Sequence, residues 1–504
     1  MKEQFDYTNF YREANQDITR NTSLVKYLNK KYFDIRGVVL GIDLENFVEG
    51  NGNLENRFAA TLENIKNNLL GRGRKLIDSG IKAEEQYGIK IRTYRITTSP
   101  VPYLIKHFAN GGEEVKIKEK FKGVALMLDG IAKELTDYCV KAYEEASHKD
   151  KSSLGFYRKG IEKDVYIAGF TSRVEKGADN IDRIHIETLP EILDKTSRIF
   201  ASVNIAETRH GINSDIINLI ASKIMEMKDN GAKFSAVTNM PPNTPFYPAS
   251  YHSAGEHAIT LGMAGAGVIT DVIKGSNGKD YSMIERKIIE AQGLMIRLSE
   301  RIGKQVAGEV GIKYLGLDLS HGSVFSHGEK NSIAAAIEAV NGRKIGSAGT
   351  LSDFGFVLSG LQKGAEAATS SLVGYGGEFI PVSEDYVMAL RMSEGILTYG
   401  NLLSMCGVCA AGVDMLILDR YSPIETINGI ITDVATMATW NKKPLGVRLI
   451  VPNKECKTNE RGFVVLGGLL GEGPEYSAIY RPKDPALLNN KMGLIPRPTG
   501  SSRR

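Results

Sequence analysis

A histidine and a glutamate lie close together in this sequence, directly after a stiff, proline-rich segment. Four prolines within residues 241–248 exclude a helix there, and His252 and Glu256 follow directly. Imidazole exchanges protons near neutral pH, so His252 with Glu256 could act as general acid and base. The two residues are four apart and could also share one helical face and bind a divalent metal. The alternative is that His252 and His257 are surface histidines of a polar loop.

Carboxylates and amides also follow buried strands. Asp318 and Ser320 end one predicted strand, and Asn204 and Glu207 follow another. Ligand sites of α/β sheets and barrels gather at strand ends. We therefore assign Asp318 a catalytic role and the other three residues a role in binding substrate. Each carboxylate could equally cap the helix that follows it.

Three further side chains suit chemistry on an anionic substrate. Glu384 is a second candidate catalytic carboxylate, with helix capping as the alternative. Cys409 lies between a helical pattern and a strand and could be a nucleophile if its pKa were lowered, although buried thiols are usually inert. Cys406 and Cys409 form a lone C-x-x-C pair, and zinc would need a second one. Arg448 is assigned to a substrate carboxylate.

Glycines cluster where strands meet helices. The clusters are Gly262, Gly265 and Gly267; Gly374, Gly376 and Gly377; and Gly467, Gly468, Gly471 and Gly473. Loops without Cβ atoms let backbone N–H groups point at an anion, so Gly376, Gly377, Gly467 and Gly468 are assigned to substrate binding. The alternative is tight turns and close helix packing. No cluster matches a dinucleotide or P-loop fingerprint, so the cofactor stays unknown, with a divalent metal as the candidate.

Apolar strands that alternate with helical patterns predict an α/β fold. The strands have nearly continuous apolar texture, which is typical of strands covered on both faces. Ten are predicted, at 37–44, 89–97, 164–170, 198–204, 233–239, 258–270, 312–319, 413–418, 445–451 and 463–469. A capping box of Ser282 with Glu285 predicts the start of a long helix. With no linker or repeat in view, we expect an N-terminal helical extension over 1–32, one domain over 33–481, and a polar surface segment over 482–504.

Bulk properties exclude several classes of partner. The 504 residues include 63 basic and 59 acidic side chains, without a block of like charges that could hold nucleic acid. We find no apolar run of the roughly 18 residues that a membrane span needs and no signal-peptide pattern. Four cysteines fit a reducing compartment. We therefore expect a cytoplasmic protein with no membrane or nucleic-acid partner.

Several strings, collinear over nearly the whole chain, resemble the domain of unknown function 711 family, also called the PFL-like family. They are 33–36 with Gly41, 168–170 with 175–177, 202–205 with 211–213, His252 with 255–256, 318–320, 379–385, 409–415, 447–448 and 467–471. The resemblance implies a ten-stranded α/β barrel like those of pyruvate formate-lyase and ribonucleotide reductase, with helices outside and the site inside. It also suggests a small ACT-domain partner, and we expect a homo-oligomer, with a dimer as the simplest form.

The sequence departs from those radical enzymes. It has no Arg-Val-x-Gly-Tyr-type motif near the C-terminus and no adjacent cysteine pair. We therefore expect an enzyme that performs non-radical lyase, isomerase or hydrolase chemistry on a small anionic metabolite inside the barrel. One alternative is a metabolite-binding regulatory protein that acts through a partner. A second is a glycyl-radical-type enzyme activated by another protein.

Overall fold

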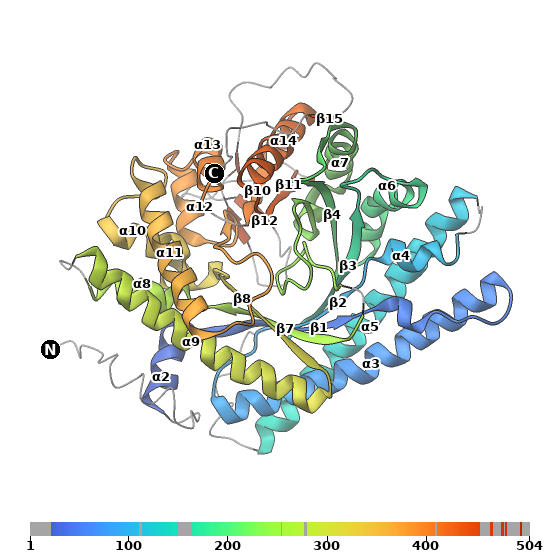
Figure 1. The fold of residues 1–504 in the computed structure, drawn as a ribbon, viewed down its shortest axis with the longest axis horizontal. Coiled ribbons are helices and arrows are strands. Elements are labelled where there is room, and N and C mark those ends of the chain that lie inside the picture. The colour runs from blue at the N-terminus through green and yellow to red at the C-terminus, as the bar shows by residue number, and fades with distance from the viewer. Residues whose placement is uncertain are drawn as a thin grey trace.

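The computed structural model describes residues 22–109, 113–149, 163–253, 255–276, 280–408, 411–453, 464–466, 475–477, 479–480 and 494–495. Within these ranges the chain forms one large curved sheet, with helices on its outer side (Figure 1). The strands are almost wholly buried, as their apolar texture predicted. The predicted α/β fold is confirmed.

The first half of the sheet contains five parallel strands. They are β1 (Asp34–Ile42), β2 (Tyr94–Thr98), β3 (Val165–Arg173), β4 (Ile199–Glu207) and β6 (Phe234–Thr238). The helices that connect them cover the outer face, as parallel connections require. They are α3 (Leu54–Tyr87), α4 (Val101–Lys106), α5 (Glu114–Lys149), α6 (Asn180–Lys195) and α7 (Ser214–Met227), with α2 (Ser23–Lys30) before β1.

The second half runs antiparallel to the first. Its strands β7 (Ala258–Ala264), β8 (Lys313–His321), β10 (Gly412–Leu418) and β11 (Leu445–Ile450) join the first half at two antiparallel seams, β1 with β7 and β6 with β11. Its helices are α8 (Ala266–Lys274), α9 (Tyr281–Val310), α10 (Ile333–Asn341), α11 (Thr350–Ala368), α12 (Tyr386–Ser393), α13 (Tyr399–Met405) and α14 (Ile424–Asn441). Each half is one continuous stretch of chain.

Residues 371–381, which we call the closing segment, fill the place between β8 and β10. Leu317 N donates to Ser371 O at 3.1 Å, and Val373 N donates to Leu317 O at 3.0 Å. Farther along, β9 (Ile380–Pro381) pairs in parallel with β10. The ring of strands is therefore complete, and the predicted α/β barrel is confirmed by its own pairing.

The sequence misplaced one strand and overextended another. The predicted strand 463–469 contains β12 (Val464–Leu466), which pairs with β13 (Glu475–Ser477) in a separate two-stranded sheet. Short strands β5 (Gly211–Asn213), β14 (Ile479–Tyr480) and β15 (Leu494–Ile495) pair at the margins of the main sheet. The predicted strand 258–270 was too long, because α8 begins at Ala266 and an apolar run does not distinguish a strand from a buried helix.

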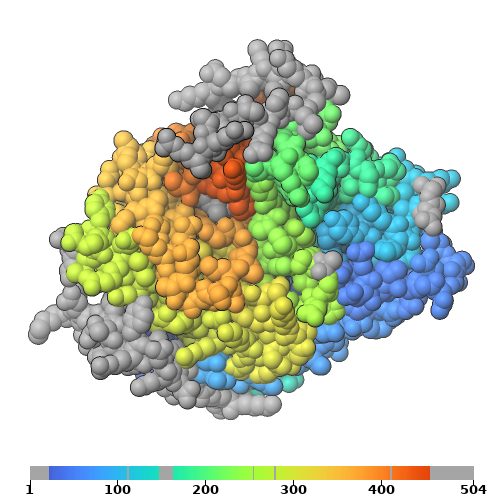
Figure 2. Space-filling model, viewed as in Figure 1, coloured from blue at the N-terminus to red at the C-terminus, as the bar shows by residue number. Residues whose placement is uncertain are grey.

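The connection between the two halves passes through the barrel. Residues 239–253 and 255–257, which we call the interior connection, contact strands on several sides of the ring. Arg95 Nη1 of β2 donates to Pro245 O at 2.8 Å, and Thr171 Oγ1 of β3 donates to Ser250 O at 3.3 Å. Figure 2 shows green and orange surfaces meeting at the centre of this face.

Candidate functional site

Glu384 and Arg448, which were predicted as site residues, lie together in the structure. Arg448 of β11 donates to Glu384 Oε1 at 2.8 Å and to both oxygens of Asp414 on β10 at 2.5 and 2.9 Å. Burial lowers the pKa of Arg448, but the charges of Asp414 and Glu384 outweigh this effect and raise it. Arg448 is therefore occupied by two carboxylates of the protein itself. Helix α12 is capped by Asp385, not by Glu384.

Asp318, Ser320 and the glycine pair Gly376 and Gly377 also come together. Asp318 is fully buried and accepts hydrogen bonds from Ser320 N and Oγ, from Tyr375 N at 2.7 Å and from Gly376 N at 3.3 Å. Ser320 Oγ accepts from Gly377 N at 3.2 Å. Burial raises the pKa of Asp318, and these hydrogen bonds oppose the rise. These hydrogen bonds of Asp318 and Ser320 hold the closing segment against β8.

His252 and Glu256 do not form the helical pair that their spacing allowed. No helix covers them, because the prolines and Gly255 hold this stretch in an irregular path. His252 is buried against Gly41 of β1, and its Nε2 contacts the backbone oxygen of Glu256 at 3.0 Å. Burial lowers the pKa of His252. The Glu256 side chain is exposed, so the two side chains do not converge on a metal.

Asn204 and Glu207 lie at the end of β4 in a charged cluster with two residues that the sequence analysis did not select. Asn204 Nδ2 donates to Glu175 Oε2 at 3.1 Å. Arg173 Nη2 donates to Glu175 Oε1 at 2.9 Å and to Glu207 Oε1 at 3.0 Å. The cluster joins the carboxyl ends of β3 and β4, which are neighbouring parallel strands.

Three predicted residues, Cys409, Gly467 and Gly468, lie outside the described residues. Within the described ranges, we find no group of three or more His, Cys, Asp or Glu side chains arranged to hold a metal ion. The same part of the chain contains no helix with the length and apolarity that crossing a bilayer requires.

Arg95 of β2 is a site residue that the sequence analysis missed. It is 8% exposed and donates through Nε to Thr93 Oγ1 at 3.0 Å and through Nη1 to Pro245 O at 2.8 Å. Its guanidinium lies 5.0 Å from the centre of the Tyr247 ring. No sequence motif marks it, but an arginine within the apolar run 89–97 was an available signal.

Arg95 differs from the other buried arginines that the structure describes. Arg92 pairs with Asp34 at 2.5 Å and Arg448 with two carboxylates, whereas no described carboxylate is within hydrogen-bond distance of Arg95. Burial and the nearby charge of Arg36 lower the pKa of Arg95 to about 10, and the charge of Glu384 opposes this change. Arg95 is thus a buried cation without a counter-ion among the residues that the structure describes.

His321, at the end of β8, gives a testable pH dependence. It is fully buried, contacts Gln292 Oε1 through Nε2 at 2.7 Å, and burial lowers its pKa to about 3. Below pH 6.5 the imidazole of His321 binds a proton in the unfolded chain but stays neutral in the folded chain. Stability is therefore lost as the pH falls from 6.5 toward 3. Relative to His321→Gln, we expect the wild type to lose about 1.4 kcal/mol per pH unit in this window.

Urea denaturation at pH 6, 5 and 4 measures this difference. The partly exposed His210→Gln variant is the control and should keep the slope of the wild type. Parallel pH profiles for wild type and His321→Gln would contradict the prediction.

The strand pairing and the charged interior define an α/β barrel of two oppositely directed halves. The chain belongs to the family described as Uncharacterised ACR (DUF711), whose model matches residues 26–458. The chain is 32% identical to a UPF0210 protein of Carboxydothermus hydrogenoformans, over 89% of this chain and 91% of the relative. It is 31% identical to a UPF0210 protein of Methanocaldococcus jannaschii, over 89% and 92%. The predicted family membership is confirmed.

Among solved structures, the chain is similar to the anaerobic ribonucleotide reductase from Thermotoga maritima in complex with dATP and CTP. The identity is 10%, the TM-score is 0.43, and the match covers 94% of this chain and 91% of the other. The same reductase with citrate in the active site matches with a TM-score of 0.42 and 9% identity, over 83% and 79% of the two chains.

Proposed function

We propose that this protein is an enzyme that binds a small anionic metabolite inside the barrel and performs non-radical lyase, isomerase or hydrolase chemistry on it. The observation that carries the proposal is Arg95, a buried guanidinium without a carboxylate partner among the described residues. Burying an unpaired charge costs several kcal/mol, and a bound anion would offset that cost. Arg36 adds a second positive charge nearby.

Glu384 is the acid/base group that we propose beside this anion. Its charge acts on Arg95, and its side chain keeps 21% exposure although it receives a hydrogen bond from Arg448. Arg448 orients this carboxylate through a charge-assisted bond, which is a common way to fix a proton-transfer group. In this arrangement Arg95 binds the substrate, Glu384 moves the proton, and Arg448 is a positioning residue.

Arg95→Gln tests the proposal through binding and stability together. Isothermal titration calorimetry with pyruvate and with inorganic phosphate should show binding to the wild type and at least about tenfold weaker binding to the variant, because a hydrogen bond to a charged group is lost. Without anion, Arg95→Gln should be as stable as the wild type or more stable, because it removes an unpaired buried charge.

Arg286→Gln on the outer helix α9 is the matched control, since it removes one exposed positive charge. It should bind both anions as the wild type does. The proposal fails if Arg95→Gln is less stable than the wild type and binds the anions equally well. Binding without turnover of any tested metabolite would favour the regulatory alternative, because the same buried cation would serve a sensor.

A further inference from the structure

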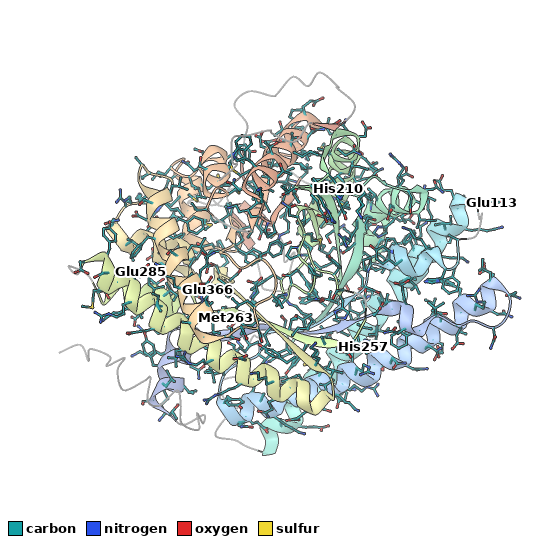
Figure 3. All side chains as sticks on the ribbon, viewed as in Figure 1. Glu113, His210, His257, Met263, Glu285 and Glu366 are labelled. Atoms are coloured by element: carbon teal, nitrogen blue, oxygen red, sulfur yellow. The ribbon has the colours of Figure 1, made fainter. Side chains whose placement is uncertain are left out.

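A surface cleft lies outside the barrel, between the middle of α3, the carboxyl end of α9 and the residues at the beginning of β7 and β8. We call it the α3–α9 cleft. Its cavity volume is about 740 Å³, which is within the range of small-molecule sites. Arg72, His257 and Lys313 contribute to its lining, and Figure 3 labels His257 at the start of β7. A smaller cleft of about 370 Å³ adjoins it, shares Arg72 and adds Lys75.

The cations of this cleft have no ion-pair partner in the part of the chain that the structure describes. Arg72 and Lys313 form no hydrogen bond or ion pair with the described residues, and Arg72 Nε is buried without a partner. Two other cations on the same helix are paired, Arg74 with Glu134 at 2.7 Å and Lys82 with Glu309 at 3.0 Å. Nδ1 of His257 is likewise buried without a described partner. The cleft thus contains nitrogen atoms of Arg72, Lys313 and His257 that are available to bind a ligand.

The charge balance of the cleft favours an anion. Glu256 is the acidic side chain among the residues that line it, against Arg72 and Lys313. The carboxyl end of α9 adds a partial negative charge of about one half, which is smaller than one full cation. Burial and the charge of Arg72 lower the pKa of His257, and the charge of Asp43 opposes this change. The neutral ring can therefore donate one N–H to a ligand.

We propose that the α3–α9 cleft is a second binding site, which takes a small organic ligand bearing a carboxylate or phosphate group. Arg72 binds two oxygens of that group with its planar fork, and Lys313 and His257 supply the remaining donors. The site is separate from Arg95, which lies inside the barrel. It adjoins the interior connection, because Gly255, Glu256 and His257 of that connection line it.

Two variants test this site in the Arg95→Gln background, which removes the proposed barrel site. Arg72→Gln deletes the main cation. Gly308→Leu fills the cleft, because a Cβ atom at Gly308 meets nothing within 4 Å and leucine is the better helix former. The probes are inorganic phosphate and citrate, which separate phosphate from carboxylate ligands, and calorimetry measures their dissociation constants.

We expect each variant to weaken binding of the preferred probe at least tenfold. Lys66→Gln, an exposed cation on the same helix, and Gly130→Leu, an exposed helical glycine with equally open space, are the matched controls and should stay within twofold. Wild-type affinity in Arg72→Gln and Gly308→Leu would overturn the proposal. So would loss of all binding of phosphate and citrate in Arg95→Gln alone, a result that would leave the proposed function intact.

Discussion

Replacing Arg448 with methionine is expected to lower the free energy of unfolding by about 3–5 kcal/mol, the usual effect of removing one partner from a buried ion pair. The side chain is 5% exposed and holds Asp414 and Glu384 at hydrogen-bond distance. Without the guanidinium, two carboxylates face each other in a poorly solvated interior. Urea denaturation at pH 7 measures the loss.

The same variant should show a characteristic pH dependence. Mutual repulsion raises the carboxyl pKa values of the folded variant above those of its unfolded chain, so the folded variant binds more protons. Its stability relative to the wild type should therefore recover as the pH falls from 7 toward 4.5. Arg448→Lys is the control, because it keeps the charge and should lose less. A loss below about 1 kcal/mol, or a loss independent of pH, would show that the pair does not stabilise the fold.

Gly374→Ala is expected to cost about 3 kcal/mol through backbone strain and overpacking at the closing segment. Gly374 has φ of +79°, and a Cβ atom there would lie 2.1 Å from Asp318 Oδ2. That oxygen accepts the Tyr375 N–H that fastens the closing segment to β8. The substitution therefore combines an unfavourable backbone conformation with a collision at the point where the barrel closes.

Gly376→Ala separates these two effects. Gly376 has φ of +64°, but a Cβ atom at this position would meet nothing within 4 Å. It should cost only about 1 kcal/mol, the usual strain of the left-handed conformation. Thermal and urea denaturation of both variants measure the difference. Equal losses would mean that the contact with Asp318 has no part in stability.

Local sequence patterns predicted most of the barrel because its strands are apolar on both faces and end at glycine or polar residues. The closing segment escaped prediction for a physical reason. Residues 371–381 pair through one bridge at Leu372 and two residues of β9, so they carry no strand-length apolar run. The start of helix α9 was also predicted at the wrong residue. The N-cap is Asp280, not Ser282, and the Ser282 hydroxyl donates a hydrogen bond to the side chain of Asp280.

The sequence predicted some residues of the candidate site but not their hydrogen-bond partners, and it did not predict Arg95. Strand-end reasoning selected Asp318 and Ser320, and the clustering of glycines selected Gly376 and Gly377 separately. It did not reveal that these groups satisfy one another, since hydrogen-bond partners depend on tertiary contacts. Arg95 was missed because nothing local shows that a strand arginine lacks a counter-ion. Only the packing of the interior connection against β2 reveals that.

The arrangement of the two halves also bears on how the chain avoids aggregation. Each half is a separate continuous stretch of sequence whose outermost strands meet those of the other half at the seams, β1 with β7 and β6 with β11. Half of the barrel alone would present two open edges bordered by apolar strands, which recruit strands from other molecules. Closure therefore protects the chain from intermolecular pairing as well as enclosing the candidate site.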